Sequence, residues 1–216
     1  MSRTLERALG ARAFQLELTS VAESWAWMRS DLLVRLGPFA LVVLFVWLVW
    51  RPRWLGVGLG DLRAQLLFGV AGGAVLFLVA VYAQLPLSRR RGGLRVPADG
   101  ADAAAQGAYY ALNGPLEEAF FRGLLQGGLA IVLGGPAGFL VGTAAYVLYH
   151  RLGSWRWLDV LATVGAGVPL GLAFWLLPGP PSLLGVAIAH IAGTCGFLGP
   201  GPYLLRRLGL LGAQQP

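Results

Sequence analysis

Three ionisable side chains, Glu117, Glu118 and Arg122, lie within six positions of a strongly apolar part of the chain. On insertion scales a charged side chain at the centre of a bilayer costs about 2.5–3.5 kcal/mol, so such residues mark a functional site by default. His150 and His190, which are the only histidines, are their expected partners. Carboxylates and imidazoles are the groups that most often move protons in enzymes. The set therefore predicts a site for acid–base chemistry within a membrane.

The two adjacent glutamates are expected to differ in role. Successive residues of a helix point about 100° apart, so Glu117 and Glu118 do not serve one ligand symmetrically. Glu118 and Arg122 are four positions apart with the acid first, which is the favourable order for an ion pair. We therefore predict a structural Glu118–Arg122 pair. Glu117 is left without a local partner and is the candidate general base or acid.

Each histidine has a polar residue on the same helical face. Tyr146 precedes His150 by four positions, and Thr194 follows His190 by four. A histidine between apolar helices can also be a plain interhelical hydrogen-bond donor, and that alternative stays open for both. Two histidines and a glutamate can bind zinc, but no HExxH motif is present and the ligands would come singly from three helices. We predict no metal and no cofactor.

Composition indicates a polytopic membrane protein built as one bundle. Hydrophobic residues make up 56% of the 216 positions and charged residues only 12%, against about 25% charged in soluble domains. The net charge of +7 could suggest nucleic acid. However, the basic residues are all arginines at the ends of apolar runs, where they meet lipid headgroups. The predicted partner is membrane lipid and not nucleic acid.

The N-terminal segment is amphipathic. Between Phe14 and Leu32 apolar residues repeat at spacings of four and three, which places them on one helical face. We predict a helix over residues 3–30 that lies on the membrane surface or packs on the bundle, as a first unit covering residues 1–32. A solvated coiled-coil arm is the alternative.

The rest of the chain predicts an all-α, polytopic transmembrane helical bundle of about six spans over residues 33–200, followed by a cytoplasmic tail over 201–216. A helix over 103–112 precedes the third span, and Asn113-Gly114-Pro115 is expected to break or kink the chain, because proline suits the first position of a new helix. The predicted spans are 33–50, 64–85, 115–133, 137–150, 158–177 and 182–198.

The arginines predict the orientation of the bundle. With a cytoplasmic N-terminus and six crossings, the opposite side holds only Arg51, Arg53 and Arg63, and Arg35 snorkels at the end of its span. This bias predicts that both termini are cytoplasmic. The cytoplasmic side then holds Arg3, Arg7, Arg12, Arg29, Arg35, Arg89, Arg90, Arg91, Arg95, Arg151, Arg156, Arg206 and Arg207.

Three motifs in this region resemble those of a known family. The segment 115–125, Pro-Leu-Glu-Glu-Ala-Phe-Phe-Arg-Gly-Leu-Leu, resembles the EExxxR motif of the CPBP family, the type II CAAX prenyl endopeptidases and related bacterial proteases, also called the ABI family. Tyr146–His150 resembles its FxxxH motif, and His190–Thr194 its HxxxN motif. The resemblance covers about residues 103–200.

The resemblance implies a role for each residue. Glu117 would activate a water molecule that His150 helps to hold, and His190 and Thr194 would stabilise the oxyanion. Tyr146 stands where the family has Phe, and Thr194 stands where it has Asn. A threonine hydroxyl reaches less far than an asparagine amide and often bonds to its own helix backbone, so it is the weaker donor.

The predicted function is that of an intramembrane glutamic endopeptidase, a hydrolase acting on a membrane-associated protein or peptide. The substrate could be of the CAAX type and lipidated, carry a C-terminal sorting signal, or be related to a bacteriocin. The predicted location is a bacterial cytoplasmic membrane. Two alternatives stay open: a catalytically inactive membrane scaffold or immunity protein of the same fold, and a small proton-coupled transporter that uses Glu117.

Overall fold

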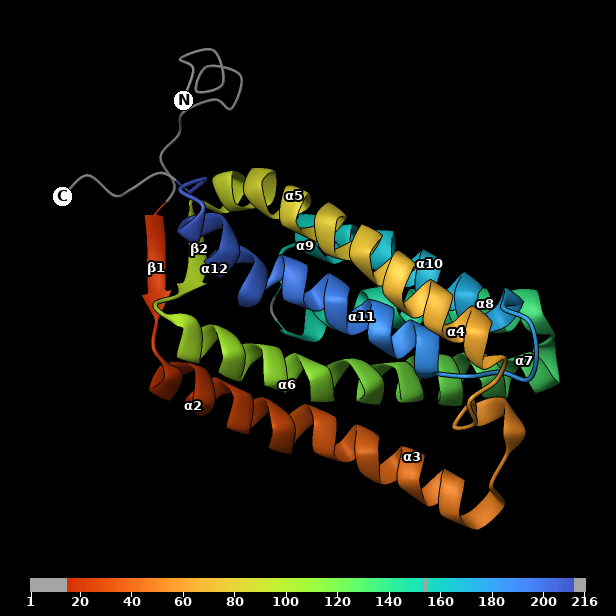
Figure 1. Cartoon of the computed structure of the whole chain (residues 1–216). Coiled ribbons are helices and arrows are strands. Elements are labelled where there is room, and N and C mark those ends of the chain that lie inside the picture. The colour runs from red at the N-terminus through yellow and green to blue at the C-terminus, as the bar shows by residue number, and fades with distance from the viewer. Residues whose placement is uncertain (1–14, 154, 212–216) are drawn as a thin grey trace.

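The computed structural model describes residues 15–153 and 155–211, which form an elongated bundle of helices (Figure 1). This confirms the predicted all-α fold class. The only two strands in the described residues are short and lie at one end of the bundle. The α-helices are α2 (Val21–Asp31), α3 (Gly37–Trp50), α4 (Leu62–Leu67), α5 (Gly73–Arg91), α6 (Gly100–Glu118), α7 (Gly128–Leu133), α8 (Gly135–Tyr149), α9 (Trp157–Ala162), α10 (Val164–Leu176), α11 (Leu184–Phe197) and α12 (Pro200–Arg207).

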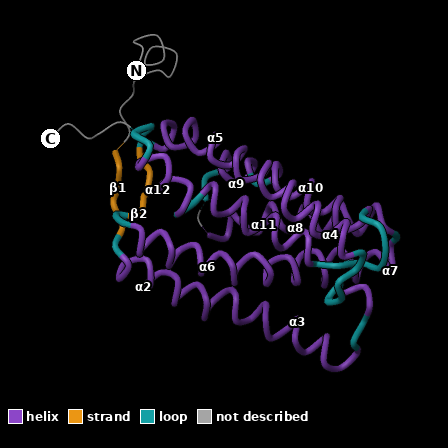
Figure 2. The backbone as a smooth tube through the Cα atoms, in the orientation of Figure 1, coloured by secondary structure: helices purple, strands orange, loops and turns teal. Residues whose placement is uncertain are grey.

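Successive helices run back and forth along one long axis. The strands β1 (Gln15–Thr19) and β2 (Gly93–Pro97) lie at one end, and the loops before α4 and after α10 lie at the other (Figure 2). Helix α11 lies in the middle, where it packs against α5, α6 and α10. The residues of the third predicted motif are therefore on the most enclosed helix.

The prediction of a helix over residues 3–30 is wrong at residues 15–19. These form β1, which pairs in parallel with β2. The helix begins only at Val21, where Ser20 and Glu23 form a reciprocal capping box. Apolar spacing alone could not reveal a strand whose partner lies more than 70 positions away. Residues 1–14 lie outside the described part of the chain.

There is also no separate interfacial helix after Ser20. Helix α2 continues through a π-helical segment, Leu32–Leu36, into α3 and so joins the first predicted span without a break. Its predicted apolar face is only partly buried: Met28 is 0% exposed, but Trp25 is 58% exposed. The first part of the predicted tail is helical and packed on the bundle, because α12 covers Pro200–Arg207 and buries Leu205.

The predicted break at Asn113-Gly114-Pro115 is wrong, and the alternative of a kink there stays a prediction. Helix α6 runs through Pro115 to Glu118 and continues as a π-helical segment, Ala119–Gly127, into α7. Tertiary packing overrides the local signal here. A Cβ at Gly114 would lie 2.9 Å from the side chain of Ile191, so the absent side chain lets α6 approach α11 closely. Helix α7 ends at Gly134, which has a φ of +88° that glycine tolerates.

Within the described part of the chain, three helical stretches are long and apolar enough to cross a membrane: Val21–Trp50, Leu62–Arg90 and Trp157–Leu176. The bent pair α11 and α12 would add a fourth if it acts as one span. The predicted span 115–133 contains the charged cluster, and α8 has only 15 residues, about 22 Å of helix. The protein is thus integral to a membrane, and the number of about six spans stays a prediction.

The arginine-rich segments gather at the strand end of the molecule. Arg156 donates to the backbone carbonyl of Arg90 at 3.3 Å, and α12 packs against β2. Arg51, Arg53 and Arg63 lie at or near the loops of the opposite end (Figure 1). Among the described residues, the arginine of β2 and those of α12 therefore lie at the end opposite Arg51, Arg53 and Arg63, and the orientation of the termini stays a prediction.

Helix α8 packs unusually close to the helix that carries the glutamates. A Cβ at Gly138 would lie 2.6 Å from the backbone oxygen of Gln126, and a Cβ at Gly142 would lie 2.7 Å from the Gln126 side chain. Two glycines on one face thus bring the backbones together, as small residues do between membrane helices. This approach places the C-terminal end of α8, with Tyr146 and His150, beside the acidic cluster.

We predict that Gly138→Ala lowers the Tm in detergent by several degrees, because overpacking costs about 1–3 kcal/mol. The control is Gly165→Ala in α10, where an added Cβ meets nothing within 4 Å. Equal Tm values for the two variants would show that the α8 contact tolerates a methyl group.

Candidate active site

The predicted Glu118–Arg122 ion pair is present at the centre of the bundle. Nε of Arg122 donates to Oε2 of Glu118 at 3.2 Å, and both side chains are 0% exposed. Arg122 also donates to the carbonyl of Gly167 at 3.1 Å and to Oγ1 of Thr143 at 3.4 Å. Its guanidinium carbon lies 4.7 Å from the centre of the Tyr146 ring. Arg122 therefore ties α8 and α10 to the helix of the glutamates.

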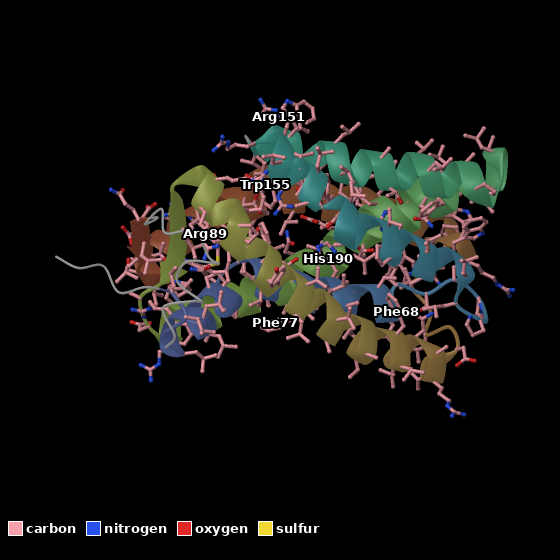
Figure 3. The ribbon with its side chains drawn as sticks, turned by 90° about the horizontal axis from the view of Figure 1, so that it is seen from above. Phe68, Phe77, Arg89, Arg151, Trp155 and His190 are labelled. Carbon is pink, nitrogen blue, oxygen red and sulfur yellow. The ribbon has the colours of Figure 1, made fainter. Side chains whose placement is uncertain are left out.

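His190 lies between the two glutamates. Its Nδ1 is 2.7 Å from Oε1 of Glu118, and its Nε2 is 3.6 Å from Oε2 of Glu117. A carboxylate oxygen accepts hydrogen bonds, so we assign Nδ1 of His190 as the donor in this contact. Figure 3 shows His190 in the interior of the bundle, whereas Arg151 lies at its edge. Glu118 thus orients the imidazole and leaves Nε2 directed at Glu117.

The expectation that Glu117 lacks a local partner is wrong. Its Oε1 accepts from Nδ2 of Asn113 at 3.0 Å, lies 3.5 Å from the hydroxyl of Tyr149, and is ion-paired with Arg35. Arg35 does not snorkel outward as predicted, because the buried carboxylate attracts its guanidinium. The two oxygens of Glu117 differ: these donors converge on Oε1, while Oε2 faces Nε2 of His190.

His150 caps the C-terminal end of α8. Its Nδ1 lies 2.8 Å from the backbone oxygen of Tyr146, and its ring contacts those of Tyr146, Tyr149 and Trp155 at 4.9–5.2 Å between centroids. Tyr146 in turn packs edge-on against His190, with 5.7 Å between ring centroids. The tyrosine therefore fills the wall between the two histidines, and its ring does the packing that a phenylalanine ring would do.

A cavity of about 850 Å³ adjoins these residues, and only one of the two glutamates, Glu117, lines it. Glu118 and Arg122 are not among the residues that line it. Thr194, one helical turn beyond His190 and half-buried, does line it. Five residues predicted from the sequence share this wall: Glu117, Tyr146, His150, His190 and Thr194.

Sequence reasoning missed several polar residues of this wall. Asn113 had a usable signal, because it precedes Glu117 by four positions in one helix. Arg35 comes from the N-terminal helix and Tyr149 from α8, and no spacing rule links either to Glu117. Within residues 15–153 and 155–211, no group of three or more His, Cys, Asp or Glu side chains is arranged to hold a metal ion.

Residues 102–195 match a family model described as type II CAAX prenyl endopeptidase Rce1-like. Over these residues the chain is similar to the type II CAAX prenyl endopeptidases. This confirms the resemblance predicted from the three motifs, and it supports a CAAX-type membrane endopeptidase in general. The matched Rce1-like region contains Glu117, His150, His190 and Thr194, whereas Arg35 lies outside it. No curated protein and no solved structure matches the chain.

We predict that Arg122→Ala lowers stability strongly, because it leaves Glu118 buried without its cation. Breaking one partner of a buried pair typically costs about 3–5 kcal/mol. Thermal unfolding in detergent checks this, with Arg207→Ala, at an exposed position, as the control. If both variants unfold at the wild-type temperature, the pair contributes nothing to the fold.

Proposed function

We propose that this protein is an intramembrane glutamic endopeptidase in which Glu117 activates the water that attacks a peptide bond of a membrane-associated substrate. One observation carries the proposal. Of the two adjacent glutamates, only Glu117 lines the cavity, and its Oε2 lies 3.6 Å from Nε2 of His190. Glu118 is engaged by Arg122 and His190 behind the cavity wall.

The two facing atoms suit a bound water. A water about 2.8 Å from each of Oε2 and Nε2, the usual hydrogen-bond length, forms a triangle with their 3.6 Å separation. In this position it donates one proton to the Glu117 carboxylate, the general base. His150, on the same cavity wall, limits where the water sits.

The proposed step balances as a hydrolysis. The water oxygen bonds to the scissile carbonyl carbon while its proton passes to Oε2 of Glu117. The carbonyl oxygen becomes an oxyanion, which accepts hydrogen bonds from the Thr194 hydroxyl and, once the water oxygen has bonded to the carbon, from Nε2–H of the doubly protonated His190. The carbon–nitrogen bond then breaks, and the proton on Glu117 passes to the leaving amine.

The Glu118–Arg122 pair has a supporting role in this proposal. The Glu118 carboxylate at 2.7 Å favours the protonated imidazole that donation to an oxyanion requires. Arg122 fixes the Glu118 carboxylate in place. A carboxylate that orients a histidine without touching the substrate is a recurring arrangement in hydrolytic sites.

The substrate is proposed to be a peptide or protein that reaches the cavity from the membrane. Apolar side chains from α5, including Leu76, Val79 and Ala83, also line the cavity. Such a surface accepts the apolar part of a membrane-bound peptide, whether a lipid anchor or a C-terminal sorting signal. We further propose a bacterial cytoplasmic membrane with both termini inside, supported by the arginines at the strand end.

We predict that Glu117→Gln abolishes cleavage while the protein still purifies as a folded bundle, because an amide cannot accept the proton of the water. Two assays check this: a farnesylated, quenched-fluorescent peptide ending in a CAAX sequence, and the appearance of new peptide ends in a bacterial membrane proteome. Glu17→Gln, which changes an acid that is 66% exposed, is the control and should keep full activity.

Two outcomes would contradict this assignment. Near-normal turnover by Glu117→Gln, together with complete loss in a folded Glu118→Gln variant, would reverse the roles of the two carboxylates. Absence of cleavage by the wild type in both assays would favour the inactive scaffold. If the wild type instead moves protons across vesicle membranes in a Glu117-dependent way, it is a transporter.

We also predict that Thr194→Val lowers kcat far more than it raises KM, since an oxyanion donor acts only as charge develops. Loss of one such donor typically costs about 10²–10³ in rate. Thr194→Asn is the matched variant, because it supplies the family's usual donor, and it should keep or raise kcat. A silent Thr194→Val would mean that this side chain only packs.

A further inference from the structure

Arg35 makes polar contacts with four other residues of the cavity wall. It belongs to the N-terminal helix, outside the matched region. Its Nη1 bonds to Oε1 of Glu117 and to the hydroxyl of Tyr149. Its Nε donates to Oδ1 of Asp31 at 2.7 Å, and its Nη2 bonds to Oδ2 of Asp31 and lies 3.0 Å from the hydroxyl of Tyr109. All five residues line the cavity.

The Arg35 guanidinium is bound by Asp31 and Tyr109 as well as by Glu117. Asp31 grips it through two oxygens, and a bidentate contact of this kind fixes the plane of the guanidinium as well as its position. The Tyr109 hydroxyl donates to the same Asp31 carboxylate and so fixes the carboxylate in turn. The remaining nitrogen, Nη1, points at Glu117.

The local backbone supports this orientation. Arg35 lies within the π-helical segment Leu32–Leu36, immediately after Asp31. A π-helical turn is wider than an α-helical turn and is frequent at functional sites. The helix from Val21 to Trp50 is continuous through this segment.

We infer that Arg35 is a positioning residue for the proposed hydrolysis: by binding Oε1 of Glu117, with Asn113 and Tyr149, it directs Oε2 towards His190 and the cavity. The inference rests on the proposed function. Three donors on one carboxylate oxygen leave the other oxygen to take the proton of the water. Arg35 would not touch the substrate itself, because its nitrogens are bound to Asp31, Tyr109, Tyr149 and Glu117.

The charges favour this role over a simple structural pair. Asp31 and Glu117 are both acidic and both contact one cation, so removing Arg35 would leave two carboxylates facing one another across the cavity wall. A nearby cation favours the ionised carboxylate, which is the form that a general base needs. A lysine would keep the charge but could not bind Asp31 and Glu117 in one plane.

The first test is kinetic and uses the full-length protein with the farnesylated, quenched-fluorescent peptide. Arg35→Gln should lower kcat by about 100-fold, as misplacing a catalytic group by about 1 Å does, and change KM by less than about threefold. Arg35→Lys should give an intermediate kcat. Methylguanidine added to Arg35→Ala should restore part of kcat, whereas methylamine should restore less. Arg95→Gln, at an exposed ion pair, is the control.

The second test does not depend on activity. Dicyclohexylcarbodiimide enters membranes and reacts with protonated carboxyl groups. We expect it to modify Glu117 at least about tenfold faster in Arg35→Gln than in the wild type, because the favouring cation is gone. Peptide mass spectrometry locates the adduct, and labelling of Glu118, which keeps Arg122, should not change.

The outcomes separate this inference from the proposed function. Equal labelling of Glu117 in the wild type and Arg35→Gln would show that Arg35 does not act on Glu117, whatever the enzyme does. An unchanged or raised kcat in Arg35→Gln would also overturn the inference, and a change in KM alone would make Arg35 a substrate-binding residue. If the wild type cleaves nothing, the proposed function fails, and the labelling still decides whether Arg35 governs Glu117.

Discussion

The whole site depends on one buried ion pair, Glu118 with Arg122, at the centre of an apolar bundle. Two charges in such a place are tolerable only when their remaining hydrogen-bonding capacity is satisfied. Arg122 meets this demand with the Gly167 carbonyl and the Thr143 hydroxyl, and Glu118 meets it with His190. The pair therefore sets the spacing of α6, α8, α10 and α11, and it aims the imidazole of His190.

Adjacent positions in one helix then acquire opposite roles. Because Glu118 points into the protein, Glu117 points about one quarter-turn away, to the cavity. There the donors Asn113, Tyr149 and Arg35 occupy one oxygen and leave the other beside His190. A polar wall of this kind costs stability in a membrane protein, and the contacts of Arg122 and Arg35 offset part of that cost by leaving few of its groups unpaired.

The sequence predicted the parts of the site that follow from local helix geometry. Glu118–Arg122 is an i, i+4 pair, and Tyr146–His150 and His190–Thr194 share helix faces, so their placement required only the period of the helix. The predictions from the sequence failed where a contact with a distant segment determines the local structure. Arg35 meets Glu117 across 82 positions, β1 needs β2 to be a strand, and α6 passes Pro115 because Gly114 packs on α11. None of these partners is visible in a local window.

The central claim is that Glu117 acts as a base on water and not as a nucleophile. A single turnover with enzyme in excess over substrate, in water enriched in the heavy oxygen isotope, tests this most directly. The account predicts one heavy oxygen in the newly formed carboxyl group of the product and none in the peptide that contains Glu117. Heavy oxygen in the Glu117 side chain, or an unlabelled product carboxyl, would show a covalent acyl intermediate and contradict the account.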